Sequence, residues 1–222
     1  MGFIRGALIT IFSIVLFFFF ILMNFSLIVS LSLEHDTFQP ALNNSIGKLL
    51  GDYGTQVAFD QEELDTLYYT EYNCEFWQCV KESISNSLVP LVLFSEKARE
   101  YWSQKFLLSL GLSLLVFALI FLISKNRSTT FIVTGALLII SALPFRRLDW
   151  ILKFINEEVS PIFSVFFTKA HSVFVTIVVI GIILIVAGIL CKIFGWKLKF
   201  TKNEEIPKED LRKPKLKKKP LK

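Results

Sequence analysis

Apolar residues are concentrated in three long runs and one shorter run, at 6–32, 106–124, 172–189 and 129–143. None of these runs contains an Asp, Glu, Lys, Arg or His residue. A helix needs roughly 20 apolar residues to cross a bilayer, and continuous rather than alternating apolar character favours helices over the strands of a barrel. We therefore predict four transmembrane helices, with bounds at 1–32, 106–124, 129–144 and 172–196.

The first and the third of these helices need further interpretation. Arg5 gives the first run a basic start, and Ser30-x-Ser32 resembles a small-residue cleavage site. The apolar stretch is about twice as long as the roughly 7–15 residues of a cleavable signal core, so we interpret 1–32 as an uncleaved signal-anchor. In the short third helix, Pro144 is expected to end or kink the helix.

The segment between the first two runs, 33–105, has helical spacing of its apolar residues rather than the composition of a loop. One helix is predicted to start near Asp36, with Pro40 in its first turn. A second is predicted to open at Asp60 with a capping-box variant, and a third to cover 76–86. We expect these helices to form a lobe between the first and second transmembrane helices.

The second polar segment, 145–171, carries apolar residues on one helical face and is predicted to be amphipathic. Ser160-Pro161 is a helix-start signal, so the last helix is expected to begin near Pro161. Its 36 residues to Trp196 would measure about 54 Å. We expect the part beyond the bilayer to pack against the lobe.

Composition and charge indicate that the protein is embedded in a membrane and how its helices are oriented across it. The chain has 222 residues, of which 53% are hydrophobic and 19% charged, whereas a soluble domain carries about 25% charged residues. The 33–105 segment has twelve acidic and five basic residues, and the 192–222 tail has twelve basic and four acidic residues. Because cytoplasmic loops carry the excess of Lys and Arg, we expect both termini in the cytoplasm and the lobe outside. The 145–171 segment, with four basic and three acidic residues, departs from this rule.

Two of the three cysteines lie in the sequence CEFWQC, at positions 74–79 of the lobe. Disulfides persist outside the cytoplasm, so we predict that Cys74 pairs with Cys79, for a stabilisation of about 2 kcal/mol in so small a ring. Two unpaired, buried thiols are the alternative. Phe76 and Trp77, between the cysteines, are either buried against the helices of the lobe or exposed to a partner.

The sequence offers few groups for catalysis. It has no HExxH, nucleotide-binding glycine pattern or GxSxG motif, and the absence of ionisable residues from the spans argues against an ion-coupled transporter. We expect no cofactor. The weak candidates for a divalent-metal site are Glu34, His35, Asp36 and His171; alternatively, the two histidines are interfacial residues that never meet.

Polar and small residues inside the apolar runs predict contacts between helices, because such residues allow close approach and interhelical hydrogen bonds in membranes. The polar ones are Asn24, Ser109, Ser113, Thr134 and Ser141, and the heptad-spaced glycines are Gly181 and Gly188.

Four apolar spans with an outer cysteine pair resemble the architecture of the quinone-linked disulfide-forming membrane proteins of the DsbB family. Those proteins use a CxxC pair and a second outer cysteine pair. Here the spacing is CxxxxC, and 145–171 contains no cysteine, so no residue role is transferred. Claudin-type proteins also have a large outer loop with cysteines, but their loop is largely β and carries a different motif.

These observations predict an all-α integral membrane protein with four transmembrane helices and a helical extracytoplasmic lobe between the first and second. The function they favour is that of a non-enzymatic, multi-pass cell-membrane protein, a scaffold or interaction subunit that presents the acidic lobe. Phe76, Trp77 and the surrounding acidic side chains are the candidate contact residues. A thiol-redox protein using Cys74 and Cys79, or a small-solute channel, is the alternative.

The expected partners follow from the same features. The lipid bilayer surrounds the spans, and a membrane or extracytoplasmic protein binds the lobe. The disordered basic tail, 197–222, is expected to contact anionic lipid, because each Lys or Arg near a membrane surface contributes about 1 kcal/mol. No folded nucleic-acid-binding module accompanies the tail, so no nucleic acid is expected.

Overall fold

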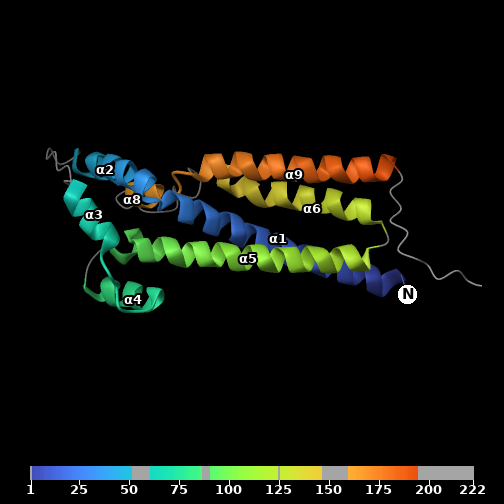
Figure 1. Cartoon of the computed structure of the whole chain (residues 1–222), viewed down its shortest axis with the longest axis horizontal. Helices are drawn as coiled ribbons and strands as arrows, with labels where there is room; N and C mark the ends of the chain where they lie inside the picture. Colours follow the sequence, from blue (N-terminus) through green and yellow to red (C-terminus); the bar gives the residue numbers. More distant parts are fainter. Residues whose placement is uncertain (1, 52–60, 87–90, 125, 147–159, 195–222) are drawn as a thin grey trace, which may run out of the picture.

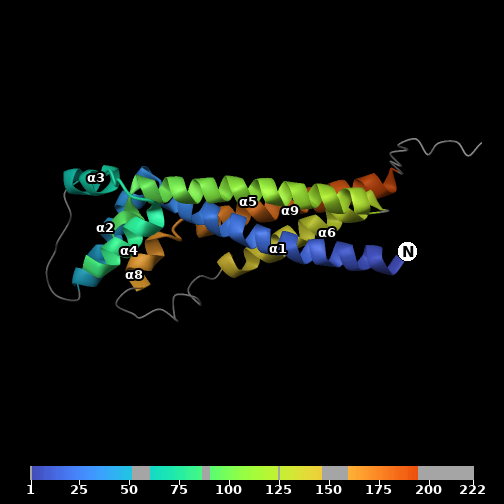
Figure 2. The ribbon, with the colours of Figure 1, turned by 90° about the horizontal axis from the view of Figure 1, so that it is seen from below.

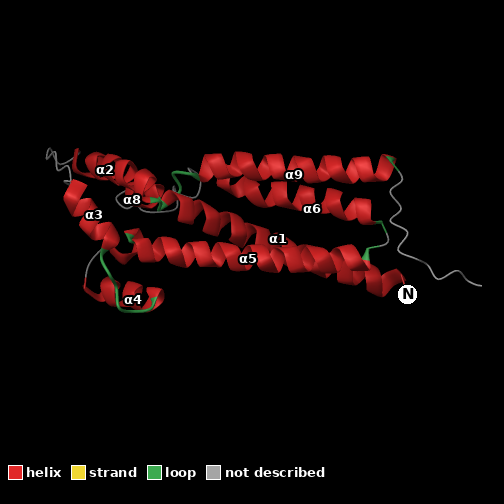
Figure 3. Cartoon of the chain, viewed as in Figure 1, coloured by secondary structure: helices red, strands yellow, loops and turns green. Residues whose placement is uncertain are grey.

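The computed structural model of the chain describes residues 2–51, 61–86, 91–124, 126–146 and 160–194. The predicted amphipathic stretch within 147–159 and the basic tail lie outside the described residues. Within these ranges the secondary structure is entirely helical (Figure 3). Four helices are long and apolar enough to cross a membrane, as the sequence predicts. They are α1 (Gly2–Ser32), α5 (Glu96–Ile123), α6 (Arg127–Ala142) with its 3₁₀ extension η2 (Leu143–Arg146), and α9 (Ala170–Ile193).

The four long helices lie side by side in the order α5, α1, α6, α9 (Figure 1). α1 packs along α5, α6 packs along α9, and the two pairs meet through α1 and α6. Large apolar side chains point away from this assembly; on α5 they include Leu107, Leu114 and Leu122, each more than half exposed. Such faces are stable only in a non-aqueous environment, which agrees with a membrane-embedded protein.

Glycines set the distance between α6 and α9. A Cβ atom on Gly135 would lie 2.6 Å from the carbonyl oxygen of Gly181. On Gly188 it would lie 2.8 Å from the carbonyl oxygen of Ser128. The two backbones therefore approach as closely as small-residue interfaces in membranes permit, and the predicted packing role of Gly181 and Gly188 is confirmed.

The five polar residues predicted to lie between helices are buried, as expected. Asn24 of α1 donates a hydrogen bond from Nδ2 to Oγ of Ser141 on α6, at 3.1 Å. This bond ties the two helix pairs together, because α1 belongs to one pair and α6 to the other. Ser109, Ser113 and Thr134 are also buried.

Among the residues that the structure describes, four short helices of the lobe lie at one end of the long ones, and a fifth, α8, packs beside them (Figures 1 and 2). They are α2 (His35–Gly51), α3 (Gln61–Tyr69), α4 (Phe76–Asn86), η1 (Leu91–Phe94) and α8 (Ser160–Val165). A stack of aromatic rings forms the centre: the ring centroid of Phe94 lies 5.7 Å from that of Phe38 and 5.1 Å from that of Phe166. The lobe core therefore draws on three separate parts of the chain.

Two local expectations are corrected. The last helix is not continuous from Pro161: α8 ends at Val165, and turns at 166–169 precede α9. The break occurs because Phe166 is buried in the lobe core, and the backbone N–H of Lys169 donates instead to Oγ of Ser32. The segment before the span nevertheless packs against the lobe, as expected.

The second correction concerns Pro40, which is the sixth residue of α2 and lies beyond its first turn. The helix starts early because the backbone N–H groups of Thr37 and Phe38 both donate to the carbonyl of Glu34, at 2.8 Å.

Candidate functional site

The cysteine pair fixes the start of α4. The sulfur atoms of Cys74 and Cys79 lie at disulfide distance, and their Cα atoms are 5.5 Å apart. Cys79 is buried in the lobe core, while Cys74 is partly exposed. The ammonium group of Lys97 on α5 donates to the backbone carbonyls of Tyr72 and Cys74. The disulfide and the lysine together hold this turn against α5.

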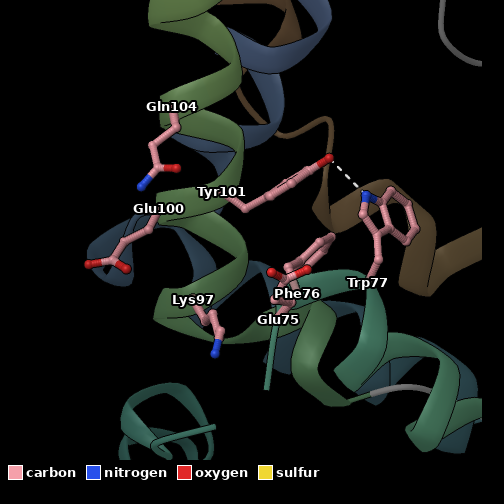
Figure 4. Close-up of a pocket in the computed structure, with 7 residues that line it drawn as sticks. All are labelled: Glu75, Phe76, Trp77, Lys97, Glu100, Tyr101 and Gln104. Carbon is pink, nitrogen blue, oxygen red and sulfur yellow. Dashed lines mark hydrogen bonds between the residues drawn. The ribbon is translucent and has the colours of Figure 1, made fainter. Parts of the chain in front are cut away.

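Phe76 and Trp77 follow that turn and point in different directions. Phe76 is buried, and its ring stacks on that of Tyr101 with centroids 4.4 Å apart and planes inclined by 18°. Trp77 is 58% exposed. Its indole N–H donates a 2.8 Å hydrogen bond to the hydroxyl of Tyr101 (Figure 4). Of the two predicted contact residues, Trp77 is therefore available to a partner and Phe76 supports it from below.

A pocket of about 270 Å³ lies beside this pair, between the start of α4 and the first turns of α5 (Figure 4). We call it the α4–α5 pocket; its lining residues are Glu75, Phe76, Trp77, Lys97, Glu100, Tyr101 and Gln104. The side chains of Glu75 and Glu100 are exposed, so the pocket combines aromatic surface with two accessible carboxylates.

The position of the pocket along α5 places it near the membrane surface. Tyr101 precedes the apolar run that starts at Phe106 by five residues, which is about 7.5 Å along a helix axis. The polar layer on each side of the roughly 30 Å hydrocarbon core is about 5–8 Å thick. In a bilayer that contains the apolar run of α5, the part of the pocket at Tyr101 and Gln104 lies at the depth of the lipid headgroups, and the part at Lys97 lies farther out.

The metal-site candidates have other partners. Nε2 of His35 lies 2.9 Å from Oδ1 of Asp65 on α3, which also accepts a hydrogen bond from Gln39. Glu34 forms a 3.8 Å ion pair with Arg99, and His171 is exposed on α9. Among the residues that the structure describes, no three His, Cys, Asp or Glu side chains are grouped as a metal site.

Burial raises the pKa of two tyrosines of the lobe. Tyr68 is fully buried and donates a 3.0 Å hydrogen bond from its hydroxyl to the carbonyl of Leu33. Burial raises the pKa of Tyr68 above its ordinary value, an effect that the nearby Arg99 guanidinium partly opposes. Burial also raises the pKa of Tyr72. Both side chains are therefore structural and stay neutral at physiological pH.

Sequence reasoning missed three residues that build this region: Lys97, Tyr101 and Asp65. A signal for two of them was present, because Lys97 and Tyr101 are four residues apart and share one face of a helix. The contact of that face with the CEFWQC turn depends on how α4 folds back, which periodicity does not encode. The pairing of His35 with Asp65 likewise joins two separate helices.

No protein-family model matches the chain, and no curated protein and no solved structure matches it significantly. The function must therefore be inferred from the geometry of the site.

Proposed function

We propose that the protein is a non-enzymatic, multi-pass cell-membrane protein whose lobe binds another protein, as a scaffold or interaction subunit. The lobe faces outward and both termini face the cytoplasm. The distribution of charge supports this orientation: the N-terminal end of α1, the C-terminal end of α5 and the C-terminal end of α9 all lie opposite the lobe (Figures 1 and 2). Arg5, Arg127 and Lys192 lie at that end, as the positive-inside rule requires of a cytoplasmic surface.

The observation that carries the proposal is the presentation of Trp77. A large aromatic side chain that is exposed yet held in one orientation loses little conformational entropy on binding, and tryptophan is enriched among residues that dominate interfaces. Trp77 is held by its hydrogen bond to Tyr101, by the buried ring of Phe76 beside it, and by the disulfide before it. These constraints leave its outer surface free for a partner.

A comparison of two exposed aromatic residues tests the proposal. The full-length protein and its Trp77→Ala and Tyr69→Ala variants would be purified from membranes in mild detergent, and co-purifying proteins quantified by mass spectrometry. Tyr69 is 54% exposed on the same lobe and serves as the matched control. We expect a partner that is retained with Tyr69→Ala and reduced about 30-fold with Trp77→Ala, as for the loss of about 2 kcal/mol at an interface hot spot. Equal recovery with both variants would refute the role of this surface.

The bilayer is itself a partner of the four spans, and the 197–222 tail is proposed to bind anionic lipid at the cytoplasmic surface. The redox alternative has less support, because the cysteine spacing is CxxxxC and 145–171 contains no second cysteine pair to pass electrons onward.

A further inference from the structure

An apolar groove lies between α1 and α5 at the ends of these helices that are farthest from the lobe, where the two helices diverge (Figure 2). Its volume is about 400 Å³, and we call it the α1–α5 groove. Its lining residues are Ile4, Arg5 and Leu8 of α1 and Leu122 and Ile123 of α5. Ile4 and Leu122 are more than two-thirds exposed, so the groove opens to the surroundings of the protein. Arg5 is the charged residue of this lining.

The groove lies where the hydrocarbon core of a bilayer meets the headgroups. Arg5 directly precedes the apolar run that begins at Gly6, and Leu122 and Ile123 are among the last residues of the run 106–124. In a bilayer that contains these two runs, the apolar walls of the groove adjoin acyl chains. The guanidinium group of Arg5 reaches the headgroups, as the charged ends of long basic side chains do next to a span.

Arg5 is not neutralised by the part of the chain that the structure describes. The acidic residues in the described ranges all lie at 34–100, in the lobe and the first turns of α5. The ion pairs among the described residues involve His35 and Arg99 as cations, and not Arg5. Arg127 and Lys192 lie at the same end as Arg5 and add positive charge there. This end of the molecule therefore attracts anions.

The same helix pair has a second pocket at the lobe end, where the arginine is already paired. This pocket, of about 360 Å³, is lined by Ser30, Glu96, Arg99, Glu100, Ser103 and Gln104. Arg99 forms its 3.8 Å ion pair with Glu34. An anion in this pocket would be repelled by the carboxylates of Glu96 and Glu100 beside it. Of these two pockets, the α1–α5 groove is thus the one whose charge suits an anion.

We infer that the α1–α5 groove binds one anionic glycerophospholipid molecule from the membrane leaflet at this end. The guanidinium group of Arg5 pairs with the lipid phosphate, to which arginine can donate two parallel hydrogen bonds. The first part of an acyl chain lies between Leu8 and Leu122. The lobe takes no part in this contact, so the inference is independent of the proposed protein-binding function. It also differs from lipid binding by the 197–222 tail, because it assigns one lipid molecule to a groove between two helices.

The charge of the groove favours an anionic headgroup over a zwitterionic one. A choline group would bring a cation toward Arg5, and no described carboxylate at this end could pair with it. The apolar walls give no preference between headgroups, because lipid chains are as apolar as the leucine side chains that they contact. Selectivity therefore depends on Arg5.

Photo-crosslinking of the full-length protein in phosphatidylcholine nanodiscs tests the inference. The probe is a trace of phosphatidylglycerol that carries a diazirine near the ester end of one acyl chain, and phosphatidylcholine with the same diazirine chain is the matched control. Crosslinked peptides would be identified and quantified by mass spectrometry for the wild type and for Arg5→Gln, Arg5→Lys and Lys192→Gln. Lys192→Gln removes the same charge from an exposed position on α9, outside the groove.

We expect the phosphatidylglycerol probe to label the peptides that contain 4–8 and 122–123 more strongly than the phosphatidylcholine probe does, and unlabelled phosphatidylglycerol to compete. Arg5→Gln should lower this labelling about fivefold, because one basic residue near a membrane surface contributes about that factor to the affinity for anionic lipid. Arg5→Lys, which keeps the charge, and Lys192→Gln should both stay within about twofold of the wild type. An unchanged melting temperature of Arg5→Gln would show that this variant is folded.

Three results would overturn the inference. Equal labelling of the groove by the two probes would mean that it holds ordinary bilayer lipid without selection. An equal loss with Arg5→Gln and Lys192→Gln would mean that the overall charge of this end attracts the lipid. Labelling confined to peptides of the 197–222 tail would mean that the tail alone binds anionic lipid.

Discussion

Tyr68 lies fully buried between the aromatic rings of the lobe, and its hydroxyl connects α3 to the end of α1. The ring contacts Phe38 and His35, and the hydroxyl donates to the carbonyl of Leu33. A neutral hydroxyl satisfies that carbonyl, whereas a tyrosinate would lose this hydrogen bond and place a charge in the lobe core that Arg99 offsets only in part. This single side chain therefore couples the stability of the lobe to pH.

We expect Tyr68→Phe to lower the free energy of unfolding of the lobe by about 1 kcal/mol at neutral pH, because one buried hydrogen bond is lost. Since burial raises the pKa of Tyr68 in the folded state, its stabilisation is present below the unfolded pKa and is lost as the pH rises through the folded value. Thermal unfolding between pH 7 and about pH 11 should show a smaller alkaline loss for Tyr68→Phe than for the wild type. Tyr69→Phe, at an exposed neighbour, should behave like the wild type.

For single residues, the sequence predicts which cysteines pair but does not decide whether a given aromatic side chain is buried or exposed. The CEFWQC spacing predicted the pairing of Cys74 with Cys79, which the structure contains at disulfide distance. It left open whether Phe76 and Trp77 are buried or exposed, and the answer differs between them. Neighbouring positions of a helix point about 100° apart, so only the packing of α4 against Tyr101 decides which ring is covered.

Among the elements, the α6–α9 pair shows most clearly how composition determines geometry. Both helices present glycine at their crossing, and backbone oxygens fill the space that a side chain would need. Without a hydrophobic driving force between helices in lipid, this close van der Waals contact supplies the attraction.

We expect Gly135→Ala to destabilise the helix pair by about 1–3 kcal/mol, as overpacking does in tightly packed interiors. The new Cβ atom would lie 2.6 Å from the carbonyl oxygen of Gly181, so the helices must move apart. Gly111→Ala on α5 is the matched control, because a Cβ atom there meets nothing within 4 Å. Melting temperatures in detergent would compare them, and equal values for both variants would contradict the close packing of α6 on α9.

The turn before α4 gives a second prediction for an element. Cys74→Ser and Cys79→Ser should each remove the ring closure, for a loss of about 2 kcal/mol, and both should leave membrane insertion intact. Cys191→Ser, at the free cysteine on α9, should have no effect on stability. If instead the variants stay as stable as the wild type while other exported proteins fail to form disulfides, the pair is redox-active.

The long helices were predictable because the limits of an uncharged run are visible in the sequence. Helix α5 passes from Lys105 into such a run and ends before Asn126, and α6 starts at Arg127. The turn at 166–169 was not predictable in this way. It arises from the burial of Phe166 against Phe94, a contact between residues far apart in the sequence.

For the whole molecule, the central relation is between shape and charge. The helical lobe lies at one end of the four long helices, and Arg5, Arg127 and Lys192 lie at the other. Arg146, at the end of η2, and Lys169, before α9, lie at the lobe end. The apolar stretch between the two ends matches the roughly 30 Å of a bilayer core; on α5 it covers 106–124. The proposed interaction site requires that the lobe face outward, which the excess of Lys and Arg in the link and tail favours.

Cysteine accessibility in intact cells tests this arrangement most directly. Thr70→Cys would probe the lobe and Asn126→Cys the link between α5 and α6, both at exposed positions and both in a Cys191→Ser background with the native disulfide left oxidised. We expect a membrane-impermeant maleimide to label Thr70→Cys in intact cells, and Asn126→Cys only after permeabilisation. The reverse pattern would place the lobe in the cytoplasm, and labelling of both positions in intact cells would place them on one side of the membrane; either result would contradict the account.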